Sequence, residues 1–361
     1  MRRAGAKVKG AGGISGVMKP ILSLAAGAAR AVAFLLAAAC AGAAVLGQGG
    51  RFSRLLDVLN NFEPLWLLGG LVAAAIWLLA GRAGRMTAWL AAAAVAICAL
   101  QMAPELLSRR DRAPAPPGVP TLKLVQFNVF EGNKDPLGTA RWILRQNADI
   151  VVIQEGSGDS QPLLDVLHRN YPYETTCSRH VPCSTSLFSR RKPIAEGGQM
   201  EPGMRSRTAT AWAVYPDPGG PIPVVGVHLT WPYPTGIQMF QSCWIDNLVD
   251  GMPKRRLIVT GDFNLTPWAF DMGRKDRRFG VPRLDQALAT FPNGRLNPFP
   301  IWTPVPVMPI DHVYAGKGWR AVSVLRGPRT ASDHFPLVVT LAPQPGPAEP
   351  WSLHRPFPTC N

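Results

Sequence analysis

Polar side chains follow the ends of several apolar segments after residue 120. These are Asn128 after LKLVQF, Glu155 after DIVVIQ, His228 after PVVGV, Asp262 and Asn264 after RLIVTG, Asp311 after VMPI, and Asp333 with His334 before FPLVVTL. Strand ends at one edge of a sheet converge on one surface, where functional sites tend to be built. Carboxylates bind cations and accept protons, and imidazoles exchange protons near neutral pH. The pattern therefore predicts a polar site assembled from several strand ends.

Each of these residues also has an ordinary structural interpretation. An Asn or Asp after a strand is usually a turn residue or a helix cap. A single His is more often a partly buried, hydrogen-bonded side chain than a catalyst. Six short apolar segments flanked by such residues, in one order, favour the functional interpretation.

The motif series resembles the endonuclease/exonuclease/phosphatase superfamily of metal-dependent phosphoesterases. The matching segments are LVQFNV, IQEGS, VHLTW, GDFNLTPW, IDHVYAG and SDHFPLVV, between about Leu122 and Leu341. The most specific feature is GDFN followed, some seventy residues later, by SDH before an apolar strand. The resemblance implies hydrolysis of a phosphoric ester with a divalent metal ion.

The resemblance also implies the residues that hold the ion. Glu155 would be the principal ligand of Mg²⁺, with Mn²⁺ as the alternative ion, and Asp333 would lie beside the metal. Asn128 would hold the site or a phosphate oxygen nearby. Phe130 departs from members that carry an acid two residues after this Asn, which leaves a second ion in doubt.

The remaining catalytic roles follow from the same resemblance. Asp262 would orient or deprotonate the attacking water, and Asn264 would donate a hydrogen bond to the phosphoryl group. His334 would contact the scissile phosphate, and Asp311 would fix its tautomer and orientation. His228 would be a second phosphate contact or a general acid. A further histidine inside IDHVYA is expected to have a packing or edge role.

Four side chains in the expected site loops are candidates for substrate binding. Trp231, Tyr233 and Trp268 would contact lipid or bases, and Arg207 would steer a phosphate. Ordinary loop packing is the alternative for the aromatic residues, and solvation is the alternative for the arginine.

Three charge-poor segments near the N-terminus predict transmembrane helices. They span about 21–47, 63–80 and 86–103, close to the ~17–25 residues that cross a bilayer. The first could instead be a cleaved signal peptide, which would still leave two membrane helices. Basic residues number seven on the side of the N-terminal tail and five on the other side. This modest bias places tail 1–20 in the cytoplasm and the C-terminal domain outside it.

Composition agrees with a chain that is part membrane-embedded and part globular. Of its 361 residues 47% are hydrophobic and only 17% are charged, and the net charge is +15. Residues 1–120 carry +9 of this charge. The remaining +6 suits a phosphate-bearing substrate but is too small to indicate nucleic-acid binding.

The predicted organisation has five parts. They are the basic tail 1–20, the three membrane helices within 21–104, a Pro-rich linker 105–120, a catalytic domain 121–342 and a Pro-rich tail 343–361. The alternation of strands and helices in the catalytic domain predicts an α+β fold, a sandwich of two sheets covered by helices. Expected strands are 122–127, 150–154, 208–215, 224–229, 257–260, 319–325 and 337–341, and expected helices are 138–146, 162–168, 236–249 and 268–272.

The cysteines leave two alternatives. Cys177 and Cys183 are close enough in sequence to bridge a loop in an oxidising compartment, and two unpaired thiols are the other interpretation. Cys40 and Cys98 fall in the membrane segments and act as small apolar side chains. Cys243 and Cys360 have no evident partner.

These observations together predict a membrane-anchored phosphoesterase that hydrolyses a phosphate mono- or diester at the inner membrane of a bacterium. The three-helix layout also resembles envelope members of the superfamily associated with glycopeptide-antibiotic resistance, which favours a lipid phosphate or pyrophosphate. An anchored extracytoplasmic nuclease is the alternative enzyme, and an inactive binding module is the alternative of another class. Beyond the substrate and the bilayer, no protein partner is inferred.

Overall fold

The computed structural model describes residues 13–81, 84–177, 183–200, 209–296 and 301–353. The chain divides into two compact units. One contains Met1–Gly47 and Glu63–Gln101, and the other contains Gln48–Phe62 and Met102–Asn361. The segments 48–62 and 102–107 therefore belong with the globular part, whereas the sequence pattern had assigned most of these residues to the membrane region.

The first unit is built from long apolar helices. They are α1 (Gly13–Gly47), α3 (Glu63–Leu79) and the part of α4 (Arg85–Leu107) that precedes residue 102. Pro20–Arg51, Arg54–Leu79 and Arg85–Leu107 are long and apolar enough to span a membrane, which agrees with the three predicted segments. Small residues allow close helix packing, because a Cβ added at Gly69 would lie 2.4 Å from the Cys40 Sγ.

In the second unit, the first sheet has the strand order β12-β13-β1-β2-β4-β3. Its strands are β1 (Leu122–Asn128), β2 (Ile150–Gln154), β3 (Tyr173–Thr176), β4 (Thr185–Ser189), β12 (Trp319–Arg326) and β13 (Leu337–Pro343). Only the β1–β2 pair is parallel, with Asn128 opposite Gln154. Two amphipathic helices, α5 (Pro136–Arg145) and α6 (Gln161–Asn170), pack on its outer face through an apolar cluster around Phe127 and Ile143.

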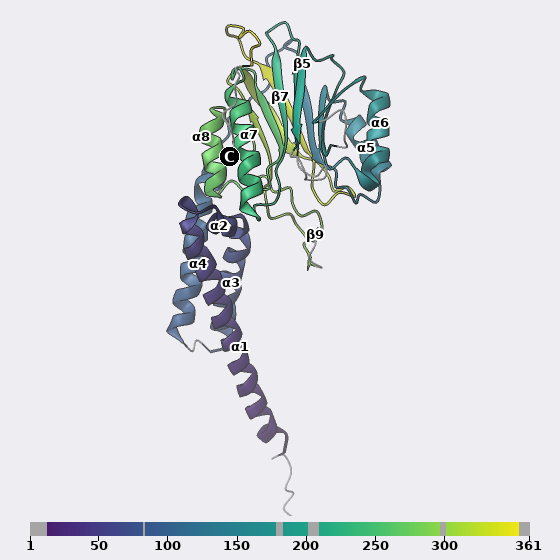
Figure 1. Cartoon of the computed structure of the whole chain (residues 1–361). Helices are drawn as coiled ribbons and strands as arrows, with labels where there is room; N and C mark the ends of the chain where they lie inside the picture. Colours follow the sequence, from purple (N-terminus) through teal and green to yellow (C-terminus); the bar gives the residue numbers. More distant parts are fainter. Residues whose placement is uncertain (1–12, 82–83, 178–182, 201–208, 297–300, 354–361) are drawn as a thin grey trace, which may run out of the picture. The chain divides into compact units, whose positions relative to one another are not determined.

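The second sheet has the order β11-β8-β7-β6-β5. Its strands are β5 (Ala195–Met200), β6 (Ala209–Tyr215), β7 (Ile222–His228), β8 (Ile258–Asp262) and β11 (Asp311–Ala315). Helices α7 (Thr235–Asp250) and α8 (Phe270–Phe279) cover its outer face. The inner faces of the two sheets share the central core, and Figure 1 shows α5 and α6 on one side of the sheets and α7 and α8 on the other. The predicted two-sheet α+β sandwich is confirmed.

Several local predictions needed correction. The helix expected at 268–272 lies at Phe270–Phe279. Strands β3, β5 and β11 were not predicted. Short elements complete the unit: η1 (Gln48–Arg51), α2 (Arg54–Asp57), η2 (Val58–Phe62), η3 (Gly158–Ser160), β9 (Arg295–Leu296) and β10 (Ile301–Trp302).

Candidate active site

The site forms where the two parallel strand pairs end together. Asn128 is the last residue of β1, and Glu155 directly follows β2. In the other sheet His228 ends β7 and lies opposite Asp262, which ends β8. Parallel strands bring their carboxyl ends to the same edge, and here the edges of both sheets meet.

Backbone conformation at this edge is unusual. Glu155 has φ 55° and Asn264 has φ 49°, so both lie in the left-handed region that non-glycine residues rarely adopt. Gly261 has φ 151°, and a Cβ added there would lie 1.9 Å from the Val227 carbonyl oxygen. Only glycine therefore fits before Asp262, where β8 lies tightly against β7.

Asn128 joins the two sheets. Its Nδ2 donates to Glu155 Oε1 at 3.0 Å and to Asp262 Oδ2 at 3.0 Å. Its Oδ1 accepts a hydrogen bond from the Phe130 amide at 3.0 Å, which fixes the orientation of the side chain. One amide group thus sets the separation of two carboxylates from different sheets.

His334 is held by Asp311. Its Nδ1 donates to Asp311 Oδ2 at 2.8 Å, and its Nε2 lies 3.7 Å from Asp262 Oδ2. Burial lowers the pKa of His334, but the charges of Asp311 and Asp262 outweigh burial and raise the pKa to about 10. The ring is therefore an imidazolium at neutral pH, with one nitrogen anchored and the other directed toward Asp262.

A second imidazole lies near the same oxygen of Asp262. His228 Nε2 is 3.5 Å from Glu155 Oε1 and 4.0 Å from Asp262 Oδ2, and its Nδ1 is 3.1 Å from Ser184 Oγ. Burial opposes the charged form, but Glu155 raises the pKa of His228 above its usual value. In turn, burial raises the pKa of Glu155, but His228 and Asn128 outweigh it and lower the pKa to about 2.

Asp262 lies within 4.0 Å of both imidazoles and differs from Glu155 in its acidity. Burial is the largest cause that raises its pKa, to about 6, while His334 and His228 oppose the shift. Its Oδ1 accepts a hydrogen bond from the Asn264 amide at 2.9 Å. Asn264 Nδ2 donates to the Leu229 carbonyl oxygen at 2.8 Å. Asp262 is thus a fixed carboxylate whose pKa suits a general base near neutral pH.

A cavity of about 310 Å³ opens beside these groups. Glu155, His228 and Asn264 line it, together with the predicted substrate-binding residues Trp231 and Tyr233. Trp231 is 41% exposed and Tyr233 is 67% exposed. The rim of the cavity is therefore aromatic, and its floor is polar.

The donors suit a hard divalent cation. The Glu155 side chain is 27% exposed and ionised, and Glu131 lines the same cavity. Oxygen donors from one or two carboxylates, completed by water and phosphate oxygens, match the preferences of such ions. The buried side chains of Asp262, Asp311 and His334 also place possible ligand atoms within 4.8 Å of one another. In that group the hydrogen bond between His334 and Asp311 already engages a ligand atom of each, so Glu155 is the better placed donor.

Three predicted site residues are not among the groups described above. Asp333, predicted beside the metal, lines a different cavity with Lys134 and Arg329. Trp268 is only 5% exposed, so burial leaves it almost no surface for substrate. Arg207 lies outside the described residues.

Other site residues were not predicted. Glu131 lines the cavity three residues after Asn128, and its only sequence signal is an acid in the first site loop. Gln126 donates to Asp311 Oδ1 at 2.8 Å; its signal is a polar residue inside an otherwise apolar strand. Phe291 packs on His334 with ring centroids 4.9 Å apart, and no local sequence pattern predicts that contact.

Comparisons with family models and with solved structures found similar proteins. A model of the Endonuclease/Exonuclease/phosphatase family matches residues 125–334. The crystal structure of SmcL superposes with a TM-score of 0.50 at 18% identity, covering 63% of this chain and 100% of that chain. D. rerio TDP2 complexed with a single-strand DNA product gives 0.49 at 14% identity, covering 61% and 98%. Sphingomyelinase C from Streptomyces griseocarneus gives 0.46 at 17% identity, covering 61% and 99%. A search of curated proteins found no match. At these identities the structural likeness concerns the fold.

Proposed function

Because the chain belongs to the Endonuclease/Exonuclease/phosphatase family, we propose that it is a membrane-anchored, Mg²⁺-dependent phosphoesterase that acts on a lipid phosphate or pyrophosphate. The chain is a metal-dependent hydrolase of phosphoric ester bonds. The observation that carries the proposal is the buried carboxylate of Asp262, which faces the imidazolium of His334 at 3.7 Å beside Glu155.

Hydrolysis requires a base for water and positive charge for the phosphoryl oxygens. Asp262 accepts the proton of the attacking water, and Asn264 donates a hydrogen bond to the phosphoryl group. His334 stabilises the negative charge that develops on the phosphate, because Asp311 holds its ring in place and keeps it protonated. His228 supplies the second cationic contact and can donate a proton to the leaving oxygen.

Glu155, with Glu131 beside it, would hold the Mg²⁺ ion, or Mn²⁺ in its place. The bound ion supplies Lewis-acid polarisation of the phosphoryl oxygen and stabilises the leaving oxygen. Glu155 suits this role because it stays ionised at every pH near neutrality. The hydrogen bond from Asn128 fixes one of its oxygens, Oε1, and the carboxylate remains partly exposed to the cavity.

A lipid substrate is supported by two features. Three helices can span a membrane, so the catalytic unit is tethered to a source of lipid phosphates. The exposed rings of Trp231 and Tyr233 at the cavity give an amphipathic rim of the kind that favours a membrane interface. For nucleic acid, the net charge of +6 over residues 121–361 is a weak electrostatic footprint.

We place the catalytic unit on the extracytoplasmic side of a bacterial inner membrane. The distribution of basic residues around the apolar helices favours that orientation. A disulfide between Cys177 and Cys183 supports it, since disulfides persist in oxidising compartments. A periplasmic reporter fused after the catalytic unit should be active, and an inactive periplasmic fusion with an active cytoplasmic one would reverse the orientation.

The substrate test uses the full chain in lipid nanodiscs with Mg²⁺. Polyprenyl pyrophosphate, plasmid DNA and a generic phosphodiester are each supplied, and phosphate release and nicking are measured. Phosphate release from the lipid without nicking supports the proposal, whereas nicking without lipid turnover identifies an anchored nuclease. An absence of turnover together with an absence of Mg²⁺ binding by calorimetry identifies a binding module.

Two variants assign any activity to this site. Glu155→Ala should abolish Mg²⁺ binding and most turnover without unfolding the protein. Glu174→Gln is the matched control, because that carboxylate pairs with His168 at the surface, 2.6 Å away, and should leave turnover unchanged. Equal activity in both variants would refute Glu155 as the metal ligand.

A further inference from the structure

Two segments that border the membrane helices in sequence are built into the catalytic unit. They are the loop Gln48–Phe62, between α1 and α3, and the end of α4, Met102–Leu107. We propose that Asn61 in the loop and Glu105 in the helix end are positioning residues of the active site, which hold the backbone directly after Asn264. The proposal rests on the proposed function for its effect on catalysis.

Asn61 contacts the chain two residues after Asn264. Its Oδ1 accepts a hydrogen bond from the Thr266 amide at 2.8 Å, and it lies 3.4 Å from Thr266 Oγ1. The Asn61 side chain is 1% exposed, and its Nδ2 donates to the Val58 carbonyl oxygen within the loop at 3.4 Å. A buried backbone N–H that loses its acceptor is costly, so this contact fixes the path of the chain at Thr266.

The same loop supports the start of α8. Asp57 Oδ1 accepts a hydrogen bond from the Phe270 amide at 2.9 Å, and Asp57 Oδ2 accepts one from the Asp271 amide at 2.7 Å. The residue at the N-cap position, Ala269, has no side chain that can cap the helix. Asp57 therefore caps α8 from a distant part of the sequence, and Figure 1 shows α2, which ends at Asp57, next to α8.

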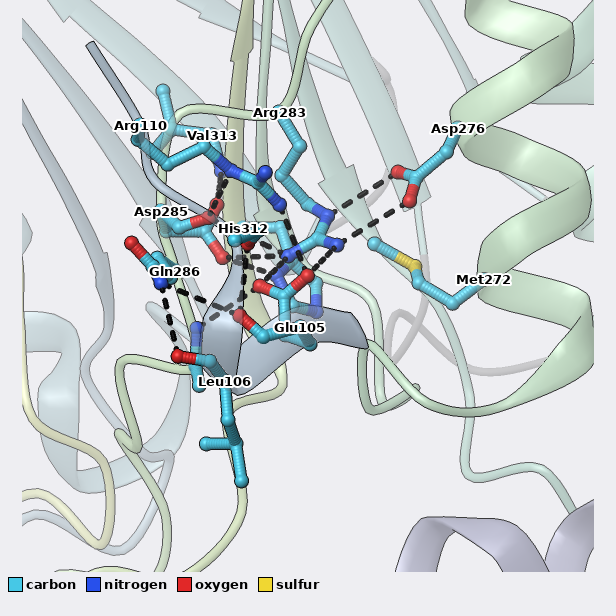
Figure 2. Close-up of polar contacts among 12 residues, drawn as sticks. Glu105, Leu106, Arg110, Met272, Asp276, Arg283, Asp285, Gln286, His312 and Val313 are labelled. Carbon is cyan, nitrogen blue, oxygen red and sulfur yellow. Dashed lines mark hydrogen bonds and ion pairs between the residues drawn. The ribbon is translucent and has the colours of Figure 1, made fainter. Parts of the chain in front are cut away.

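Glu105 reaches the site by a second route. Both of its carboxylate oxygens accept from the Arg283 guanidinium, at 2.9 Å from Nη1 and 2.9 Å from Nη2, and both side chains are buried. Figure 2 shows this guanidinium between Glu105 and Asp276. A bidentate pair of this kind fixes orientation as well as charge.

From Arg283 the contacts continue to the residue beside Asn264. Arg283 Nη1 lies 3.4 Å from Asp285 Oδ2, which accepts from His312 Nδ1 at 2.7 Å. His312 Nε2 then donates to the Leu265 carbonyl oxygen at 2.9 Å. Asn61 and Glu105 thus act on adjacent residues, Thr266 and Leu265, immediately after Asn264.

This convergence matters because Asn264 adopts a conformation that needs support. Its φ of 49° is sparsely populated, and such conformations persist when surrounding contacts over-determine them. Asn264 also lines the active-site cavity, where displacement by about 1 Å can cost about a hundredfold in rate. The contacts of Asn61 and Glu105 hold the backbone on the C-terminal side of Asn264. The Asp262 carboxylate accepts a hydrogen bond from the Asn264 amide.

The first test compares three variants of the full chain in nanodiscs, with a generic phosphodiester as substrate. Asn61→Ala removes the acceptor for Thr266, and kcat should fall about tenfold with little change in KM. Asn61→Asp retains an oxygen acceptor and should restore kcat to within about threefold of wild type. Phe52→Ala is the matched control in the same loop, because that side chain is 90% exposed.

Hydrogen exchange gives a readout that does not depend on turnover. Asn61→Ala should raise amide exchange in peptides covering 264–271 and leave β6 and β7 unchanged. Faster exchange there with unchanged kcat would reduce Asn61 to a structural role and overturn the proposal. Unchanged exchange would overturn the contact itself. If the wild type hydrolyses no phosphoester, the proposed function fails, and exchange alone decides whether Asn61 holds this segment.

A double-mutant cycle tests the convergence. Glu105→Gln keeps the shape of the side chain but removes its charge from the Arg283 pair, and we expect a loss in kcat of about tenfold. Because both residues act on one dipeptide, Asn61→Ala with Glu105→Gln should lose clearly less than the product of the single losses. A double variant whose loss in kcat equals the product of the single losses would show that the two residues act independently. It would overturn the proposal that they hold the same dipeptide.

Discussion

Two buried histidine–aspartate pairs lie on either side of strand β11. Asp311, its first residue, pairs with His334 at 2.8 Å, and His312, its second residue, pairs with Asp285 at 2.7 Å. Successive side chains of a strand point to opposite faces, so neighbouring residues serve two different environments. Both imidazoles are almost fully buried, and both receive a carboxylate on Nδ1.

The difference lies in the second ring nitrogen. His312 Nε2 is 2.9 Å from the Leu265 carbonyl oxygen, so both of its nitrogens have a protein acceptor. Among the described residues, the acceptor recorded nearest to His334 Nε2 is the Asp262 carboxylate at 3.7 Å, beyond ordinary hydrogen-bond length. A histidine whose hydrogen bonds are all made within the protein supports structure, whereas one with a nitrogen held toward a carboxylate can contact a substrate. The comparison can be tested from each side.

The largest effect is expected at the catalytic pair. His334→Ala removes the cation that faces the phosphoryl group, and kcat should fall by about 10³-fold or more while the fold persists. Phosphodiester turnover by the full chain measures kcat, and thermal unfolding checks that the variant is folded. A rate within tenfold of wild type would show that His334 is not the phosphate contact.

Disrupting the pair of His312 and Asp285 should lower the stability of the fold. His312→Ala leaves Asp285 buried without this partner and should lower the free energy of unfolding by about 3 kcal/mol. His168→Ala is the matched control, because its pair with Glu174 is at the surface and should contribute less than about 1 kcal/mol. Denaturant unfolding in detergent compares them, and equal losses would mean that the buried pair contributes nothing beyond a surface pair.

The sequence pointed to histidines on both sides of this comparison. The strand-end residues and the family motifs led to Asp262, Asp311 and His334, because chemistry of this kind depends on residue type at fixed positions along strands. The role expected for His312, packing within an apolar strand, agrees with its burial and its two hydrogen bonds. These features are local, and local patterns can be read from one sequence.

What supports the site could not be predicted in the same way. Asn61 lies 205 residues from Thr266, and Glu105 lies 178 residues from Arg283, so no periodicity or motif links either pair. The loop containing Asn61 falls between two apolar helices, and its polar residues were assigned to a connection between membrane segments. Trp268 was expected at the substrate because it follows Asn264, but it is only 5% exposed, and burial of this kind is decided by tertiary packing.

A smaller effect on kcat is expected when the side chain at position 311 keeps its shape but loses its charge. Asp311→Asn should lower kcat by about 10²-fold, since a partner that orients a functional imidazole is worth about 10–100-fold. The charge of Asp311 is the largest cause that raises the pKa of His334, so this pKa should fall from about 10 toward its ordinary value. NMR titration of the imidazole measures the shift, and a pKa that stays near 10 would assign it to Asp262 instead.

The smallest effect is expected in the pH dependence of stability, through the Asp285 carboxylate of the structural pair. Burial raises the pKa of Asp285, but His312 and Arg283 outweigh it and lower the pKa from 3.8 to about 2. A lowered pKa contributes stability that is complete above about pH 4 and is lost as the pH falls through about 2, and this shift corresponds to about 2 kcal/mol. The difference in unfolding free energy between wild type and Asp285→Asn should therefore shrink by about this amount between pH 5 and about pH 2. If the difference in unfolding free energy is constant across this range, the partners of Asp285 stabilise its ionised form no more than its protonated form. The His312 pair would then stabilise the fold by hydrogen bonding alone.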